Sequence, residues 1–105
     1  MLHIYQVILD AVEAMQPLVR RLELRDKDLG RQLRRASSSI ALNTADGMYS
    51  RGANRQLRYH TALGSARETL ACLELAQRCC ALAPPAPLAA QLNSIIGTLV
   101  RLVAA

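Results

Sequence analysis

The sequence has almost no aromatic residues. It contains no Phe and no Trp, and three Tyr are the whole aromatic set among 105 residues. A core without large rings must be filled by Leu, Ile, Val and Ala, and the abundant Leu and Ala favour helices over sheets. Few side chains are left on which single-stranded bases could stack. The composition therefore argues against a base-stacking platform and for a small helical core.

Lysine is almost absent as well. Of the thirteen basic residues only Lys27 is Lys and the rest are Arg, and the net charge is +5. Arg forms planar, two-pronged hydrogen bonds with phosphates and carboxylates, which Lys does not. A positive balance of this size favours nucleic acid or another acidic partner. The alternative is a compositional bias of a GC-rich genome, which enriches Arg and Ala.

Motifs of catalysis and of metal binding are missing. There is no Gly-rich phosphate loop, no paired-carboxylate motif, and only two His. The three cysteines, Cys72, Cys79 and Cys80, have no CxxC spacing, so they predict buried thiols in a reducing compartment rather than a zinc site or a disulfide framework. We expect no catalytic residue, no metal, no cofactor and no enzyme activity, and a cytoplasmic location.

Membrane and export signals are weak. No basic leader precedes the first apolar run, which Asp10 and Glu13 interrupt. The most apolar segment, residues 95–105, is short for a bilayer and contains Arg101. We expect neither a signal peptide nor a membrane association.

Apolar residues recur at steps of three and four in four segments, about residues 2–22, 28–49, 54–81 and 87–103. This is the spacing of one buried helix face. Asp26 or Asp28 can cap the second segment, and the prolines at 84, 85 and 87 separate the last two. Pro17 lies inside the first segment, where it predicts a kinked helix or, alternatively, a broken one. Short links imply antiparallel neighbours, so the fold class predicted for residues 1–105 is a single all-α, up-down-up-down four-helix bundle.

Two blocks carry a family resemblance, QLRRASSSIALNTADG (residues 32–47) and YHTALGSARE (residues 59–68). They resemble the "Q-hydrophobic-RRA-x-x-SI-x-x-N-x-A-(E/D)-G" and "A-x-G-S-x-x-E" signatures of four-helix-bundle proteins related to the 23S rRNA intervening-sequence proteins. The accessory variability determinant proteins of diversity-generating retroelements belong to the same group. Asp46 stands where Glu is usual, and Thr44 where a larger apolar residue is common.

The resemblance implies properties that the residues alone do not. It implies a small, non-enzymatic, all-α protein that assembles as a homo-oligomer, a ring of five in some relatives. It also implies nucleic acid, as structured RNA or DNA, and a reverse transcriptase as partners.

The two blocks are expected to meet in a structural network. If the second and third helices are antiparallel about a turn near Arg51, residues whose numbers sum to about 102 lie at one level. We therefore expect Glu68 to pair with Arg34 or Arg35, and Gly64 to be small because the serines at 37–39 cross there. The alternative is that this side of the second helix is a solvated face at which another helix crosses closely. The expected network comprises Arg35, Ser39, Asn43, Asp46, Gly64, Ser65 and Glu68.

The arginines are the one group of residues for which the sequence predicts a function. They predict a concentrated positive surface that contacts phosphates, and such binding would be sequence-tolerant and salt-dependent. Its alternative is a solubilising or salt-bridged surface, in a scaffold that binds a protein partner. The predicted nucleic-acid-binding residues are Arg20, Arg21, Arg31, Arg34, Arg51, Arg55 and Arg58.

Overall fold

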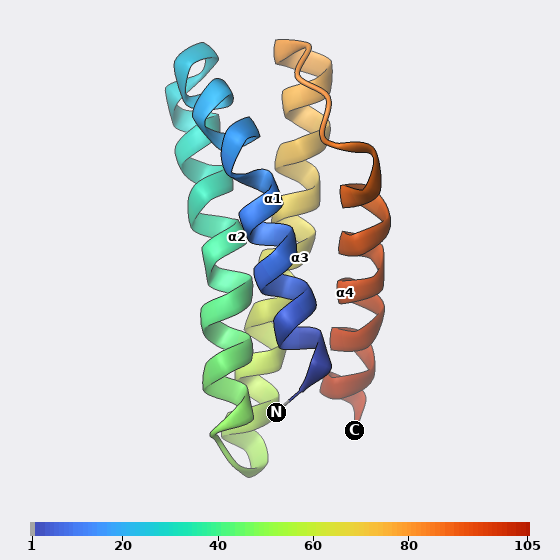
Figure 1. Ribbon diagram of the computed structural model, residues 1–105. Coiled ribbons are helices and arrows are strands. Elements are labelled where there is room, and N and C mark those ends of the chain that lie inside the picture. The colour runs from blue at the N-terminus through green and yellow to red at the C-terminus, as the bar shows by residue number, and fades with distance from the viewer. Residues whose placement is uncertain (1) are drawn as a thin grey trace.

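A computed structural model describes residues 2–105, and within them every regular element is a helix. The helices are α1 (His3–Arg25), α2 (Lys27–Met48), α3 (Gly52–Cys80) and α4 (Ala86–Ala104). Successive helices run in opposite directions (Figure 1), and each packs on the next, with α1 also packing on α4. The predicted all-α four-helix bundle is confirmed.

Short polar and proline signals set the helix ends. Asp26 caps α2, because its Oδ1 accepts a hydrogen bond from the Leu29 amide at 3.0 Å. Pro85 stands before α4 and Pro87 lies in its first turn, where a missing amide is tolerated. The first helix was expected to end at Leu22 but continues to Arg25, whose Nη1 donates to the Cys80 carbonyl at 2.8 Å. This contact joins the end of α1 to the end of α3.

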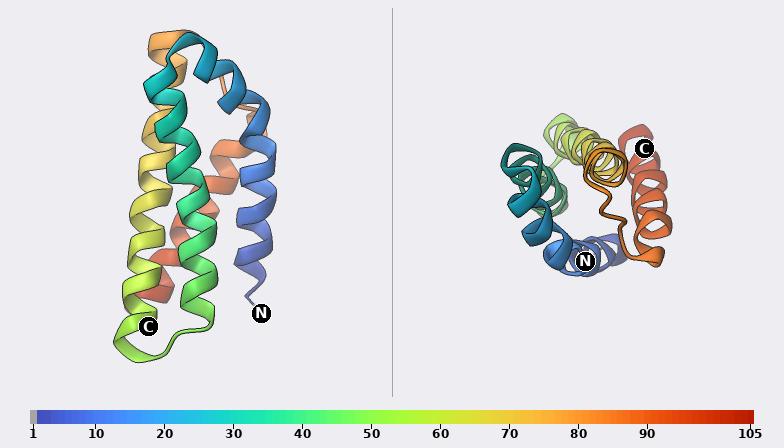
Figure 2. Two further views of the ribbon diagram at one scale, coloured as in Figure 1. Left: turned by 90° about the vertical axis from the view of Figure 1, so that its left-hand side faces the viewer. Right: turned by 90° about the horizontal axis from the view of Figure 1, so that it is seen from above.

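Pro17 lies inside α1, and the helix is continuous across it. Figure 2 shows α1 turning toward α2 in its last turns, beyond the middle of the helix. A proline ring removes one helical hydrogen bond and pushes the preceding turn aside, which bends a helix without ending it when packing continues on both sides. Met15 and Leu18 are both buried, so packing does continue. Of the two alternatives, the kinked helix is correct.

The predicted apolar seams form the core. In the view along the bundle in Figure 2, the four helices surround one axis. The buried seam side chains form one hydrophobic cluster to which all four helices contribute. The largest fully buried side chains come from α1, α2 and α4 and from the segment before α4; they include Ile8, Met15, Leu22, Leu33, Ile40, Leu82, Leu88, Leu92, Ile95 and Leu99.

Thr44 is an exception inside this core. It is fully buried, and its hydroxyl has no hydrogen-bond partner among residues 2–105. A buried hydroxyl without a partner has lost its hydration and gained nothing in exchange. Thr44, which stands where a larger apolar residue is common, is therefore a weak point of the core.

Thr44→Val is expected to raise the free energy of unfolding by about 1–2 kcal/mol, because Val has the shape of Thr without the hydroxyl. Urea denaturation measures the change. Thr61→Val is the control, since Thr61 is exposed and its Oγ1 donates to the Leu57 carbonyl at 3.0 Å. Equal or lower stability of Thr44→Val would show that the hydroxyl is satisfied in solution.

The fourth helix is the most apolar. Among the described residues, α4 is the one helix that is long and apolar enough to cross a membrane by length and composition. The expectation that the C-terminal segment is too short considered only residues 95–105, whereas the helix begins at Ala86. Leu88, Leu92, Ile95 and Leu99 are fully buried in the bundle, and 22% of the apolar window of this helix is buried.

Candidate nucleic-acid interface and the α2–α3 groove

The seven arginines predicted to bind nucleic acid are all exposed, but they do not form one surface. Arg20, Arg21, Arg31 and Arg34 lie near the link between α1 and α2; we name them the link-end arginines. Arg51, Arg55 and Arg58 lie at the turn between α2 and α3; we name them the turn-end arginines. Figure 1 places the link and the turn at opposite ends of a molecule 42 Å long. The expectation of a single concentrated surface is wrong, because even Arg34 stands 14 residues before the end of α2 at Met48, a rise of about 21 Å along the helix.

Acidic residues accompany the link-end arginines. Arg34 donates two hydrogen bonds to the Glu23 carboxylate, from Nη2 to Oε1 at 2.8 Å and from Nε to Oε2 at 3.1 Å. This is the one ion pair within residues 2–105. It holds the pKa of Glu23 below its usual value and raises that of Arg34. Asp26 and Asp28 lie in the same region, so positive charge is partly offset at this end.

Glu23→Gln tests the ion pair through pH. The folded-state pKa of Glu23 lies below its usual 4.5, so the stabilisation is present at neutral pH and is lost as the pH falls through the folded-state value. Wild type is therefore expected to melt at a slightly higher temperature than Glu23→Gln at neutral pH, and the difference should shrink as the pH falls below 4.5 and vanish below the folded-state pKa. Because the pair is solvent-exposed, high salt should also reduce the difference. A difference that persists unchanged in acid would contradict this assignment.

Acidic residues are scarce around the turn-end arginines. The sequence has no Asp or Glu between Gly47 and Arg67, none before Asp10 and none after Glu74. These segments include the start of α1, the turn and the end of α4, which meet at one end of the bundle (Figure 1). Asp46, in the last turn of α2, is the nearest acid in the sequence. Positive charge at this end is therefore largely uncompensated.

Arg55 and Arg58 lie three residues apart on one side of the first turns of α3, and Arg51 is the N-cap residue immediately before the helix. No side chain caps this helix, so its first amides are available and its dipole favours negative charge. Arg55 is held in place by its Nε, which donates to the Ser50 carbonyl at 2.8 Å and leaves the outer nitrogens free of that contact. The arrangement can bind phosphate oxygens.

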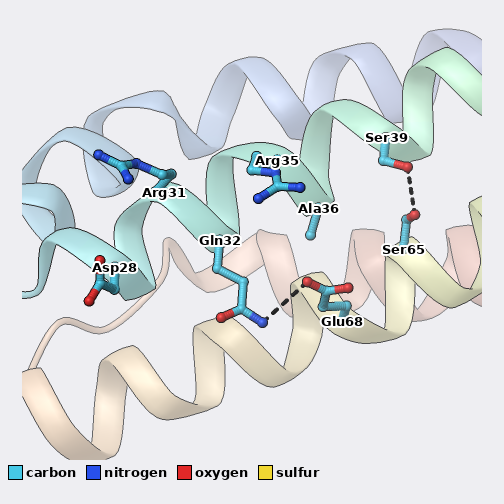
Figure 3. Close-up of a pocket in the computed structure, with 8 residues that line it drawn as sticks. All are labelled: Asp28, Arg31, Gln32, Arg35, Ala36, Ser39, Ser65 and Glu68. Atoms are coloured by element: carbon cyan, nitrogen blue, oxygen red, sulfur yellow. Dashed lines mark hydrogen bonds between the residues drawn. The ribbon is translucent and has the colours of Figure 1, made fainter.

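A polar groove of about 540 Å³ lies between α2 and α3, nearer the link end. Figure 3 shows Arg31 and Arg35 on α2 and Glu68 on α3. The Gln32 Nε2 donates to Glu68 Oε2 at 3.3 Å across the groove. Its lining consists of Asp28, Arg31, Gln32, Arg35, Ala36, Ser39, Ser65 and Glu68.

Three residues of the predicted network do meet at this groove. The Oγ atoms of Ser39 and Ser65 are 2.7 Å apart and share a hydrogen bond. Asn43 Nδ2 donates to the Ser39 carbonyl and to Ser39 Oγ, each at 3.0 Å. These half-buried contacts join the two motif blocks.

A family model described as 23S rRNA-intervening sequence protein matches residues 1–101 of the chain. The chain belongs to this family. The matched range covers α1, α2, α3 and most of α4, and it contains both motif blocks. Searches among curated proteins and among solved structures gave no match.

In this 23S rRNA-intervening sequence family member, two expected pairings are wrong. Glu68 does not pair with Arg34, because Arg34 points to Glu23 on α1. Arg35 is exposed and lines the groove, and Glu68 accepts instead from Gln32. Asp46 is also exposed, and its contact with Ser50 is through its backbone carbonyl.

The glycine expectation is wrong as well. Gly64 was expected at a close crossing, but it is exposed and an added Cβ would meet nothing within 4 Å. The close approaches are at Gly30, against the Glu23 backbone, and at Gly47, against the Tyr59 ring. Both glycines lie on the buried side of α2. Their position on the apolar side of the helical spacing could have predicted these close contacts from the sequence.

Two of the cysteines are not deeply buried. Cys72 is buried, Cys80 is half-buried and Cys79 is exposed, and all three are free thiols. Burial raises the pKa of Cys72, and the Glu68 carboxylate adds to the effect. Within residues 2–105, no three His, Cys, Asp or Glu side chains gather where they could hold a metal ion.

Proposed function

We propose that this family member is a non-enzymatic, homo-oligomeric accessory protein that binds the phosphate backbone of structured RNA or duplex DNA through its turn-end arginines. The observation that carries the proposal is the charge asymmetry of the bundle. Three exposed arginines and an uncapped helix N-terminus lie at an end almost free of acidic residues. The link-end arginines contribute less to this binding, because carboxylates lie among them.

Backbone contact suits the residues better than base recognition does. Arginine forks match phosphate geometry, and these contacts are independent of base sequence. Apart from Tyr49, no aromatic side chain in the described chain lies exposed at this end, so stacking on unpaired bases has little support. The family description refers to 23S rRNA, which makes a structured RNA the first probe to use.

The test is a salt series with two triple variants of equal charge. Arg51→Ala/Arg55→Ala/Arg58→Ala is expected to weaken binding to a labelled RNA hairpin and a DNA duplex, and to lower the slope of log K against log salt by about 3. The matched control, Arg20→Ala/Arg21→Ala/Arg31→Ala, removes three exposed charges from the link end and should change the slope much less. Oligomeric mass is recorded on every sample.

Two outcomes would contradict the proposal. The first is no binding by wild type at low salt while the protein remains folded. The second is an equal loss in both triple variants, which would mean that overall charge rather than the turn end is responsible.

A protein-binding scaffold is the second candidate function. The α2–α3 groove favours it, because charges of both signs line the groove and suit a protein surface better than a polyanion. Disassembly of the turn-end triple variant, without a specific loss of nucleic-acid binding, would support this scaffold reading.

A further inference from the structure

Tyr49 is a large aromatic side chain that the bundle leaves outside its core. It is 84% exposed, whereas Tyr59, the aromatic residue nearest to it in the sequence, is buried. Tyr49 is the C-cap residue of α2, at the turn that projects beyond the ends of α1 and α4 in Figure 1 and in the left view of Figure 2. An exposed ring with an apolar body and a polar hydroxyl is typical of a binding surface. The phosphate contacts proposed above do not use this ring.

Hydrogen bonds hold the turn around Tyr49 in one conformation. The Tyr49 amide donates to the Asp46 carbonyl at 3.3 Å. The Ser50 amide donates to the Gly47 carbonyl at 3.2 Å, and Ser50 Oγ donates to the Asp46 carbonyl at 2.7 Å. From α3, Arg55 Nε donates to the Ser50 carbonyl at 2.8 Å. A ring on a backbone fixed in this way loses less conformational freedom on binding than a ring on a mobile loop.

Positive charge surrounds the ring. Arg51, the N-cap residue of α3, follows Tyr49 by two residues, and Arg55 is tied to the carbonyl of Ser50, the residue next to Tyr49. A phosphate bound by either arginine therefore belongs to a nucleotide close to whatever the ring contacts. The turn combines one aromatic face with adjacent phosphate-binding groups.

We infer that Tyr49 stacks on the exposed face of the last base pair at an open end of an RNA duplex, while the turn-end arginines contact the phosphates next to that end. The inference rests on the proposed function and names the part of a structured RNA that the turn recognises. Every base offers an aromatic face, so such stacking is independent of sequence. A terminal pair has one free face, whereas an interior pair is covered on both sides by its neighbours.

Other ways of contacting the nucleic acid use these groups less well. A single strand is bound by successive bases stacking on several rings, and Tyr49 is the one exposed ring at this end of the described chain. Insertion between interior base pairs requires them to unstack, which costs free energy at each step. Binding along the side of a duplex uses the arginines but leaves Tyr49 in water. Only an open end engages the ring and the arginines together without unstacking.

The test compares two RNAs that share one stem. The first is a hairpin with one blunt open end, and the second is the same stem closed at both ends by loops. Wild type is expected to bind the open hairpin at least about fivefold more tightly than the closed stem. Tyr49→Ala should remove this preference, and Tyr49→Phe should keep it because the ring remains.

The matched control is Leu42→Ala, which shortens another large side chain of α2, 66% exposed and about two helical turns before Tyr49. It should keep the preference for the open end. Tyr49→Ala removes no charge, so the slope of log K against log salt should stay as in wild type, unlike that of the turn-end triple variant. Helix content by circular dichroism should be unchanged in each variant, since both side chains lie outside the core.

A fluorescent base locates the contact on the RNA. With 2-aminopurine in the terminal base pair, wild type is expected to quench the fluorescence on binding, and Tyr49→Ala should not. The same base in the middle of the stem should show no such change. Quenching at both positions, or a preference for the open end that survives in Tyr49→Ala, would overturn the stacking by Tyr49.

The proposed function and the inference fail in different ways. Steeply salt-dependent binding with equal affinity for the open and the closed stem would overturn the inference and leave the phosphate contacts standing. An absence of binding to either RNA at low salt, with the protein folded, would remove both.

Discussion

Leu92→Ala is expected to lower the free energy of unfolding by about 3 kcal/mol. Leu92 is fully buried in the core, on the same side of α4 as Leu88, Ile95 and Leu99. Truncation removes one methine and two methyl groups and leaves a cavity that neighbouring helices cannot close without losing their own contacts. A core with no Phe or Trp has no large flexible ring nearby to fill the space.

The size of this effect matters because single domains are marginally stable, with about 5–15 kcal/mol in total. A loss of about 3 kcal/mol corresponds to a fall in Tm of roughly 10–15 °C for a chain of this length. Urea and thermal denaturation, run at a concentration where the oligomeric state is constant, measure it. Leu24→Ala is the control, since Leu24 is 89% exposed and should change stability by no more than about 0.5 kcal/mol. Equal effects of the two changes would mean that Leu92 is not in the core in solution.

Gly47→Ala and Gly30→Ala are expected to be the most damaging one-carbon additions in the chain. A Cβ at Gly47 would overlap the ring of Tyr59, which is buried and cannot turn away. A Cβ at Gly30 would overlap the Glu23 backbone, so α1 and α2 would have to part. Such overpacking costs about 1–3 kcal/mol, against a helix-propensity gain of up to about 1 kcal/mol for Ala over Gly. We expect a net loss of about 1–2 kcal/mol for each, by urea denaturation.

Gly64→Ala is the matched comparison, because it is the same chemical change in a helix interior. Nothing lies within 4 Å of the added carbon, so only the propensity gain remains. The monomer is expected to gain about 0.5–1 kcal/mol. If Gly64→Ala destabilised a dilute, monomeric sample as much as Gly47→Ala does, the distinction drawn between these glycines would be wrong.

The spacing of apolar residues was sufficient to predict the buried side of a helix that packs on the hydrophobic core. The buried side of α1 follows Ile4, Ile8, Ala11, Met15, Leu18 and Leu22, as the spacing predicted. The Asp26 cap and the proline-rich segment before α4 were also readable, because each acts within a few residues of itself. The family resemblance rested on two motif blocks, and the family model confirms it over nearly the whole chain.

Long polar side chains were much harder to place from the sequence. Arg34 has several rotatable bonds and reaches Glu23 on α1, although the register of α2 against α3 put it level with Glu68. Short side chains behaved better: Ser39 and Ser65 meet within two residue numbers of the predicted level. A register argument locates backbones and short side chains, but a flexible charged group chooses among all neighbours within its reach.

By itself, the sequence determined four helices, their order and their family, because helix periodicity and end signals are properties of neighbouring residues. Only the tertiary structure decided which arginines share a surface. Antiparallel packing sends Arg51, Arg55 and Arg58 to one end of the bundle and Arg20, Arg21, Arg31 and Arg34 to the other. It also decided that Gly47 and Gly30 are the close contacts while Gly64 is open. Which side of a helix meets a neighbour depends on how all four helices are arranged, and no single segment contains that information.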